Sequence, residues 1–147
     1  MRKELDSAWW MLRIGFGLAP ALAGLDKIFR TNLLADWPSY ISPIASAVLP
    51  VSGDAFMQVI GAIELAVGVA VLTVATRLGA YVAAAWLVAI AVNLVTTGQY
   101  FDIAVRDVLM AVAAYTLARL TEVRETAAIG TSVRASVTGH AASSLGM

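Results

Sequence analysis

Long apolar runs separated by short polar stretches dominate the chain. Four runs stand out, at about residues 7–29, 55–75, 78–97 and 103–120. Each approaches the roughly 20 residues that an α-helix needs to cross a hydrocarbon core about 30 Å thick. The links after the second and third runs are short enough to form only tight helical turns. We therefore predict an all-α fold, a four-helix transmembrane bundle over residues 1–121.

The segments outside these runs predict two further features. The link at residues 30–54 holds three of the four prolines, Pro38, Pro43 and Pro50. Because proline interrupts helices, we expect short helical pieces there, forming a partly structured interfacial loop between the first two spans. Residues 122–147 are rich in Ser, Thr, Gly and Ala with scattered charges. Such a composition buries too little apolar area to order itself, so we predict a flexible cytoplasmic tail.

Composition favours a membrane environment. Hydrophobic residues make up 60% of the chain, charged residues make up 14%, and the mean hydropathy is +0.80; a soluble domain carries roughly 25% charged residues. Ten basic residues balance ten acidic ones, so nothing indicates a nucleic-acid partner, and the lipid bilayer is the expected surrounding. The absence of cysteine excludes iron–sulfur and thiol chemistry by this chain. Its one histidine, His140, lies in the predicted tail, so we expect no haem held by histidine within the membrane.

The basic residues near the ends of the runs predict an orientation. If the chain crosses four times, most of them fall on one side of the membrane: Arg2, Lys3, Arg77, Arg119, Arg124 and Arg134. Cytoplasmic loops are enriched in Lys and Arg, so we expect a multi-pass protein of the plasma membrane with both termini in the cytoplasm. A competing interpretation takes residues 21–23 as a signal-peptide cleavage site. Arg13 interrupts the apolar run before that point, which favours a retained helix.

Polar residues inside the runs are the candidate functional residues. A charged residue at the centre of a spanning helix costs roughly 2.5 to 3.5 kcal/mol on insertion scales, so such groups normally face the bundle interior or a wet cavity and have partners. We expect no metal site among them. The charged residues inside the runs, together with the amide of Asn93 and the indole of Trp86, form a predicted intramembrane polar cluster. This cluster is the candidate ligand site: Arg13, Asp26, Lys27, Glu64, Trp86, Asn93, Arg106 and Asp107.

Helical spacing predicts that the first two helices turn small and polar residues inward. Steps of three and four residues place one set on a narrow face of the first helix: Arg13, Gly17, Pro20, Gly24 and Lys27. The second helix carries a matching line: Met57, Gly61, Glu64 and Gly68. Small residues let the backbones of membrane helices approach closely. We therefore expect these two faces to line the bundle interior.

The intramembrane charges also predict ion pairs between helices. We expect Arg106 to pair with Glu64 or Asp26, and Lys27 to pair with Asp107. A purely structural interpretation stays open, because buried ion pairs can hold helices in register without any chemistry. Charged residues near helix ends can also extend to the lipid headgroups.

Several short motifs resemble the DoxX-like family of membrane proteins. In the first helix, Leu12-Arg13-Ile14-Gly15 is followed by Gly24-Leu25-Asp26-Lys27. The second helix contains Gly61-Ala62-Ile63-Glu64-Leu65-Ala66-Val67-Gly68, and the next turn contains Thr76-Arg77-Leu78-Gly79. Arg106-Asp107 fits less specifically. The resemblance covers most of the predicted bundle and none of the tail, and it carries over no catalytic residue.

This resemblance implies a four-helix protein linked to membrane redox systems, such as a subunit of thiosulfate:quinone oxidoreductase. The leading hypothesis is therefore an accessory or anchoring subunit of a membrane redox assembly, bound to a protein partner or to another copy of itself. A quinone or lipid would lie among Arg13, Lys27, Glu64, Trp86 and Arg106. Two alternatives stay open: a small proton-coupled transporter that uses Glu64, and a scaffold or assembly factor without a ligand.

Overall fold

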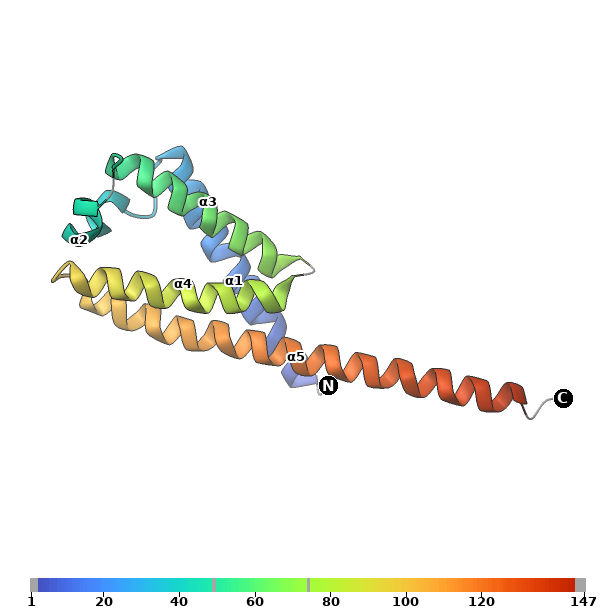
Figure 1. Ribbon diagram of the computed structural model, residues 1–147. Coiled ribbons are helices and arrows are strands. Elements are labelled where there is room, and N and C mark those ends of the chain that lie inside the picture. The colour runs from blue at the N-terminus through green and yellow to red at the C-terminus, as the bar shows by residue number, and fades with distance from the viewer. Residues whose placement is uncertain (1–2, 49, 74, 145–147) are drawn as a thin grey trace.

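The computed structural model describes residues 3–48, 50–73 and 75–144, and this part of the chain is all-α (Figure 1). Its elements, in chain order, are α1 (Lys3–Phe29), η1 (Trp37–Tyr40), α2 (Pro43–Val48), α3 (Gly53–Leu72), α4 (Thr76–Thr96) and α5 (Phe101–Ser144). The predicted all-α class is confirmed, and α1, α3 and α4 begin and end within a few residues of the expected runs. Arg2 and residues 145–147 of the predicted tail lie outside the described residues.

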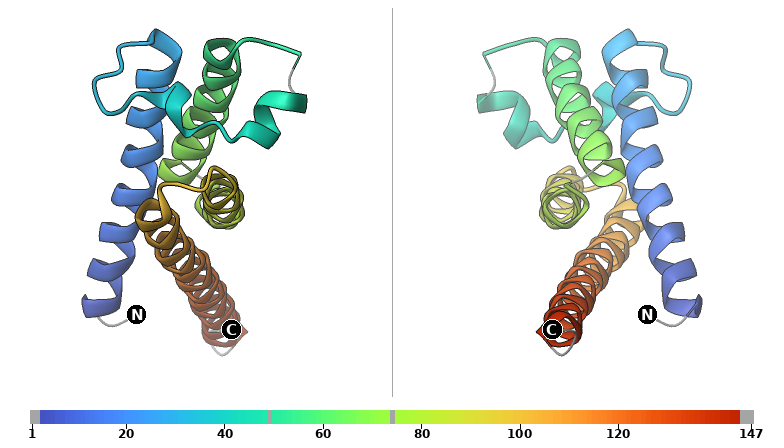
Figure 2. Two further views of the ribbon diagram at one scale, coloured as in Figure 1. Left: turned by 90° about the vertical axis from the view of Figure 1, so that its left-hand side faces the viewer. Right: turned by 90° about the vertical axis from the view of Figure 1, so that its right-hand side faces the viewer.

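The four long helices form two antiparallel pairs. α1 packs along α3, and α4 packs along α5. The pairs meet at the end where α3 leads into α4, and they diverge toward the other end, where η1 and α2 lie between them (Figures 1 and 2). Because η1 contacts α3 and α2 contacts α4, the loop bridges the two pairs where they are furthest apart. The prediction of a partly structured loop at residues 30–54 is confirmed.

Small residues fill much of the bundle core, and many large apolar side chains face outward. Val92, Leu109 and Val112 are 59%, 65% and 60% exposed. Lipid tails are as apolar as leucine, so membrane helices associate through small residues rather than by burying large apolar ones. The buried alanines of α4 and α5 follow this rule: Ala80, Ala83, Ala91, Ala104, Ala111, Ala114 and Ala118.

Three helices, α1, α3 and α4, are long and apolar enough to cross a membrane. These are the features of a small multi-span membrane protein. The expected fourth span, at the start of α5, is not among them, because Arg106, Asp107 and Arg119 all lie within residues 103–120. Three of the four predicted spans are thus long and apolar enough to cross a membrane, and the fourth predicted span forms the first part of a more polar helix that packs along α4.

Helix α5 continues far beyond its predicted end. It has 44 residues, about 66 Å at 1.5 Å per residue, and its C-terminal half projects beyond the other helices (Figure 1). The prediction that residues 122–147 lack regular structure is wrong as far as Ser144. Residues 121–138 contain no proline and a single glycine, so this stretch holds almost none of the residues that interrupt a helix most strongly. A salt bridge from Arg124 to Asp6 of α1 holds the helix just after it leaves the bundle.

Candidate functional site

Two pairs of glycines bring the backbones of α1 and α3 into contact. A methyl group on Gly24 would lie 2.4 Å from the carbonyl oxygen of Gly61, and one on Gly68 would lie 2.5 Å from that of Gly17. Any side chain at these positions would push the helices apart, so glycine is required by the close approach. All four glycines are buried. The predicted inward faces of the first two spanning helices are thereby confirmed at these positions.

The close crossing places a buried ion pair between the same two helices. Lys27 Nζ lies 2.5 Å from Glu64 Oε2, and the two side chains are 5% and 8% exposed. Lys27 Nζ also lies 3.6 Å from the centroid of the Trp37 ring, a cation–π contact that strengthens when water is excluded. Each charge neutralises the other, so removing one partner alone would leave an uncompensated buried charge.

Asp26 organises the turn that follows α1. Its carboxylate accepts hydrogen bonds from the backbone N–H of Leu33 at 3.0 Å and of Leu34 at 3.1 Å. The indole Nε1 of Trp37 donates to it at 2.7 Å, and the hydroxyl of Thr31 donates as well. Among the residues that the structure describes, Asp26 pairs with no cation. Its carboxylate ties the loop and the Trp37 ring to the end of α1.

Arg13 caps the end of α3. Its guanidinium donates to the carbonyl oxygens of Val71 at 3.1 Å, Leu72 at 2.8 Å and Thr73 at 2.6 Å. The last carbonyls of a helix have no partner within the helix, and a positive charge suits this negative end of the helix dipole. Arg13 is 14 residues from Lys27 in one helix, about 21 Å along its axis. The two cations thus serve opposite ends of the α1–α3 pair.

The candidates on α4 have different roles from each other. Asn93 Nδ2 donates to the carbonyl oxygen of Tyr40 at 2.7 Å, and Asn93 Oδ1 accepts from the backbone N–H of Ser42 at 3.2 Å. These two bonds fasten the loop to α4. Trp86 is half-buried, and its indole Nε1 is buried without a hydrogen-bond partner in the part of the chain that the structure describes.

The predicted ion pairs are wrong. Lys27 pairs with Glu64 rather than with Asp107, and Arg106 pairs with neither Glu64 nor Asp26. Arg106 is exposed and Asp107 half-buried, and neither forms a salt bridge within the described ranges. The reason is the order of packing, because α1 faces α3 while α5 lies along α4.

A second polar cluster, where α1 meets α5, was not predicted. Trp9 Nε1 donates to Thr121 Oγ1 at 2.8 Å, and the guanidinium carbon of Arg124 lies 4.3 Å from the centroid of a Trp9 ring. Arg124 also pairs with Asp6. This cluster joins the two helix pairs at the end opposite the loop. The helical spacing of Leu117, Thr121 and Arg124 is the signal in the sequence that points to it.

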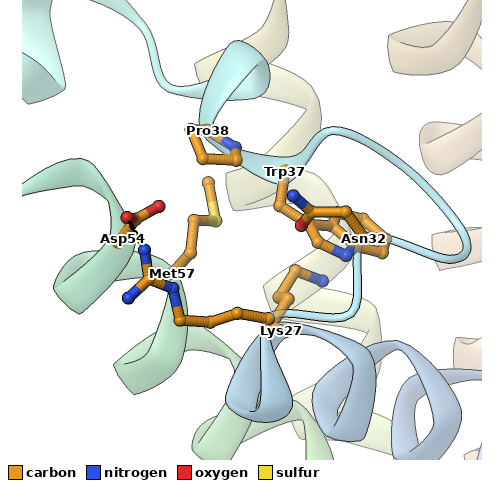
Figure 3. A pocket seen from close by; sticks show the side chains of 7 residues that line it. Lys27, Asn32, Trp37, Pro38, Asp54 and Met57 are labelled. Atoms are coloured by element: carbon orange, nitrogen blue, oxygen red, sulfur yellow. Dashed lines mark hydrogen bonds and ion pairs between the residues drawn. The ribbon is translucent and has the colours of Figure 1, made fainter.

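A pocket of about 100 Å³ opens beside the Lys27–Glu64 pair (Figure 3). It lies between the end of α1, the turn after it, η1 and the first turns of α3. Its walls are formed by Lys27, Arg30, Asn32, Trp37, Pro38, Asp54 and Met57. Sites for drug-sized ligands occupy roughly 300–1,000 Å³, so this pocket is of a size that suits a small polar group.

Comparison with known protein families, curated proteins and solved structures finds no match for this chain. The site must therefore be understood from its own contacts. Within the ranges given above, no cluster of three or more His, Asp or Glu residues could hold a metal ion. Arg13, Asp26, Lys27, Glu64 and Asn93 each hold one segment of the fold against another, so the described polar contacts act mainly in assembly of the bundle.

Proposed function

We propose that this chain is an anchoring subunit of a membrane assembly, and that it recruits a partner through the part of α5 that projects beyond the bundle. The intramembrane charges support docking over transport. Glu64, the candidate for a proton-coupled site, is already neutralised by Lys27 at 2.5 Å. A transported cation would have to displace a buried ammonium group that also contacts Trp37.

The length of α5 is the observation that carries the proposal. Near the start of α4 and midway along α5, Arg77 pairs with Glu125, and Tyr81 donates to Glu122. Aromatic and charged residues of this kind are typical of the boundary between membrane and water. Beyond that level the described side chains of α5 are exposed through Ser132, so the helix offers a rigid arm on the side where both termini lie (Figure 1).

The nature of the partner follows from the resemblance to DoxX-like proteins. We propose a membrane redox enzyme, with the electron carrier on the partner because this chain has no cysteine. A quinone would then bind between the two proteins. On this proposal, the glycine and charged residues of α1 and α3 that carry the resemblance join these two helices. The partner carries out the redox reaction.

Site-specific photo-cross-linking in native membranes tests the docking role. A photoreactive amino acid replaces Ala128, which is exposed on the projecting arm, and in a matched control it replaces Ala85, which is exposed on α4. The proposal expects a discrete heavier species from position 128 that position 85 does not give. Equal or absent cross-linking at the two positions would refute the docking role.

The identity of the cross-linked chain tests the redox part separately. Mass spectrometry of the adduct should reveal a protein that carries a flavin, a haem or an iron–sulfur cluster. A partner without any redox group would leave the anchor in place and reject the redox assignment. Cross-linking of the chain only to itself would favour a homo-oligomeric scaffold instead.

A further inference from the structure

The pocket beside Lys27 is built from two sides that are held independently. Asp54 comes from the first turn of α3, while Trp37 and Asn32 come from η1 and the turn after α1 (Figure 3). Its volume of about 100 Å³ corresponds to roughly three water molecules at about 30 Å³ each. This is the size of a phosphate or carboxylate group.

The turn that forms one wall is strained and firmly held. Arg30 and Asn32 have φ angles of 55° and 48°, which lie in the left-handed region of the backbone. Residues other than glycine rarely adopt this region. Such conformations persist where the surroundings impose them, and they cluster at ligand sites. Here the Asp26 carboxylate imposes the turn through its bonds to Leu33 and Leu34. As a result the side chains of Arg30 and Asn32 both line the pocket.

The two cations of the pocket differ in how firmly they are paired. Lys27 is locked to Glu64 and is 5% exposed. Arg30 pairs with Asp54, but the two side chains are 57% and 44% exposed. Exposed ion pairs are only weakly stabilising, so an incoming anion can displace the Asp54 carboxylate from the Arg30 guanidinium. A guanidinium then offers a planar fork of donors that matches a phosphate group.

From this geometry we infer that the pocket binds a phosphate group beside the Lys27–Glu64 pair, with Arg30 and Asn32 as the donors and Asp54 as a displaceable competitor. The inference does not depend on the docking role of α5. The group has two sources, the headgroup of a phospholipid such as phosphatidic acid, or a soluble phosphate. Trp37 lines the pocket and is of the kind found at headgroup depth, so both sources can reach it.

Equilibrium binding to the purified full-length chain tests the inference in two arms. In neutral detergent, the protein is titrated with inorganic phosphate, and a chloride titration at matched ionic strength is the control. Microscale thermophoresis measures binding in both titrations. In phosphatidylcholine nanodiscs, with and without phosphatidic acid, retained phosphatidic acid is counted by native mass spectrometry. Saturable binding in the first arm alone assigns a soluble phosphate, and retention in the second arm alone assigns the lipid.

Three variants locate the binding in this pocket. Arg30→Gln should weaken it about tenfold or more, because a charge-assisted hydrogen bond is lost, whereas Asp54→Asn should tighten it by removing the competitor. Arg77→Gln is the matched control, since Arg77 is 54% exposed and pairs with Glu125 at the other end of the bundle. Circular dichroism verifies that each variant is folded. The inference fails if neither arm shows binding, if Arg30→Gln behaves like Arg77→Gln, or if Asp54→Asn weakens binding.

Discussion

Replacing one glycine at the α1–α3 crossing should destabilise the whole bundle. In Gly24→Ala the new methyl group would lie 2.4 Å from the carbonyl oxygen of Gly61 and 2.8 Å from the backbone nitrogen of Leu65. Both are backbone atoms and cannot rotate away. The helices must therefore separate, and this separation also pulls Lys27 away from Glu64.

The size of the effect follows from the geometry. Ordinary carbon contacts begin near 3.4 Å, so the backbones must move apart by roughly 1 Å, and overpacking of this kind costs about 1–3 kcal/mol. Alanine is favoured over glycine within a helix by about 1 kcal/mol, which offsets part of that cost. Gly15→Ala is the matched control on the same helix, because nothing lies within 4 Å of a methyl group there.

Unfolding in mixed micelles, titrated with a denaturing detergent and followed by far-UV circular dichroism, measures the difference. We expect Gly24→Ala to lower the free energy of unfolding by about 2 kcal/mol relative to Gly15→Ala. Gly15→Ala itself should match the parent chain or exceed it slightly. Equal stability of the two variants would refute the claim that the backbones touch at Gly24.

Two further predictions concern the polar groups of the bundle, and the same unfolding assay checks both. Lys27→Met and Glu64→Leu should each lower the free energy of unfolding by about 3–5 kcal/mol, while the double variant Lys27→Met/Glu64→Leu recovers most of the loss. Additive losses would contradict a coupled pair. Trp86→Phe removes a buried indole N–H that lacks a partner among the described residues, so it should change the free energy of unfolding by about 1 kcal/mol or less. Trp9→Phe loses the hydrogen bond to Thr121 and should lower the free energy of unfolding by about 1 kcal/mol more than Trp86→Phe does. Equal losses in the two variants would show that the Trp86 indole is hydrogen-bonded.

The glycine and charged residues that the sequence singled out in the first two long helices come together at one interface, between α1 and α3. Gly24 contacts Gly61, and Lys27 pairs with Glu64. Arg13 closes the other end of the same helix pair by capping α3. The close spacing of glycine, cation and carboxylate therefore describes how the helices α1 and α3 are joined.

Spacing along a helix predicted which residues face inward but not which residues pair. The line that includes Gly61 and Glu64 is buried as expected, because a period of 3.6 residues is a local property of the helix. The partner of Lys27 depends on which helix packs beside α1, and several carboxylates were compatible with the spacing. Spacing along a helix also did not predict that Asp26 holds the turn after α1. The partners of Asp26 follow a stretch with unusual backbone angles at Arg30 and Asn32.

The amino-acid sequence by itself determined the all-α class, the positions of the long apolar helices, the partly structured loop after α1 and the inward faces of α1 and α3. These follow from apolar run length, proline positions and helical periodicity, which act over a few turns of chain. Only the tertiary structure decided that the four long helices form two pairs and that Lys27 meets Glu64. Those outcomes depend on contacts between residues far apart in the chain, such as Asp6 with Arg124, and local patterns do not encode the choice among such contacts.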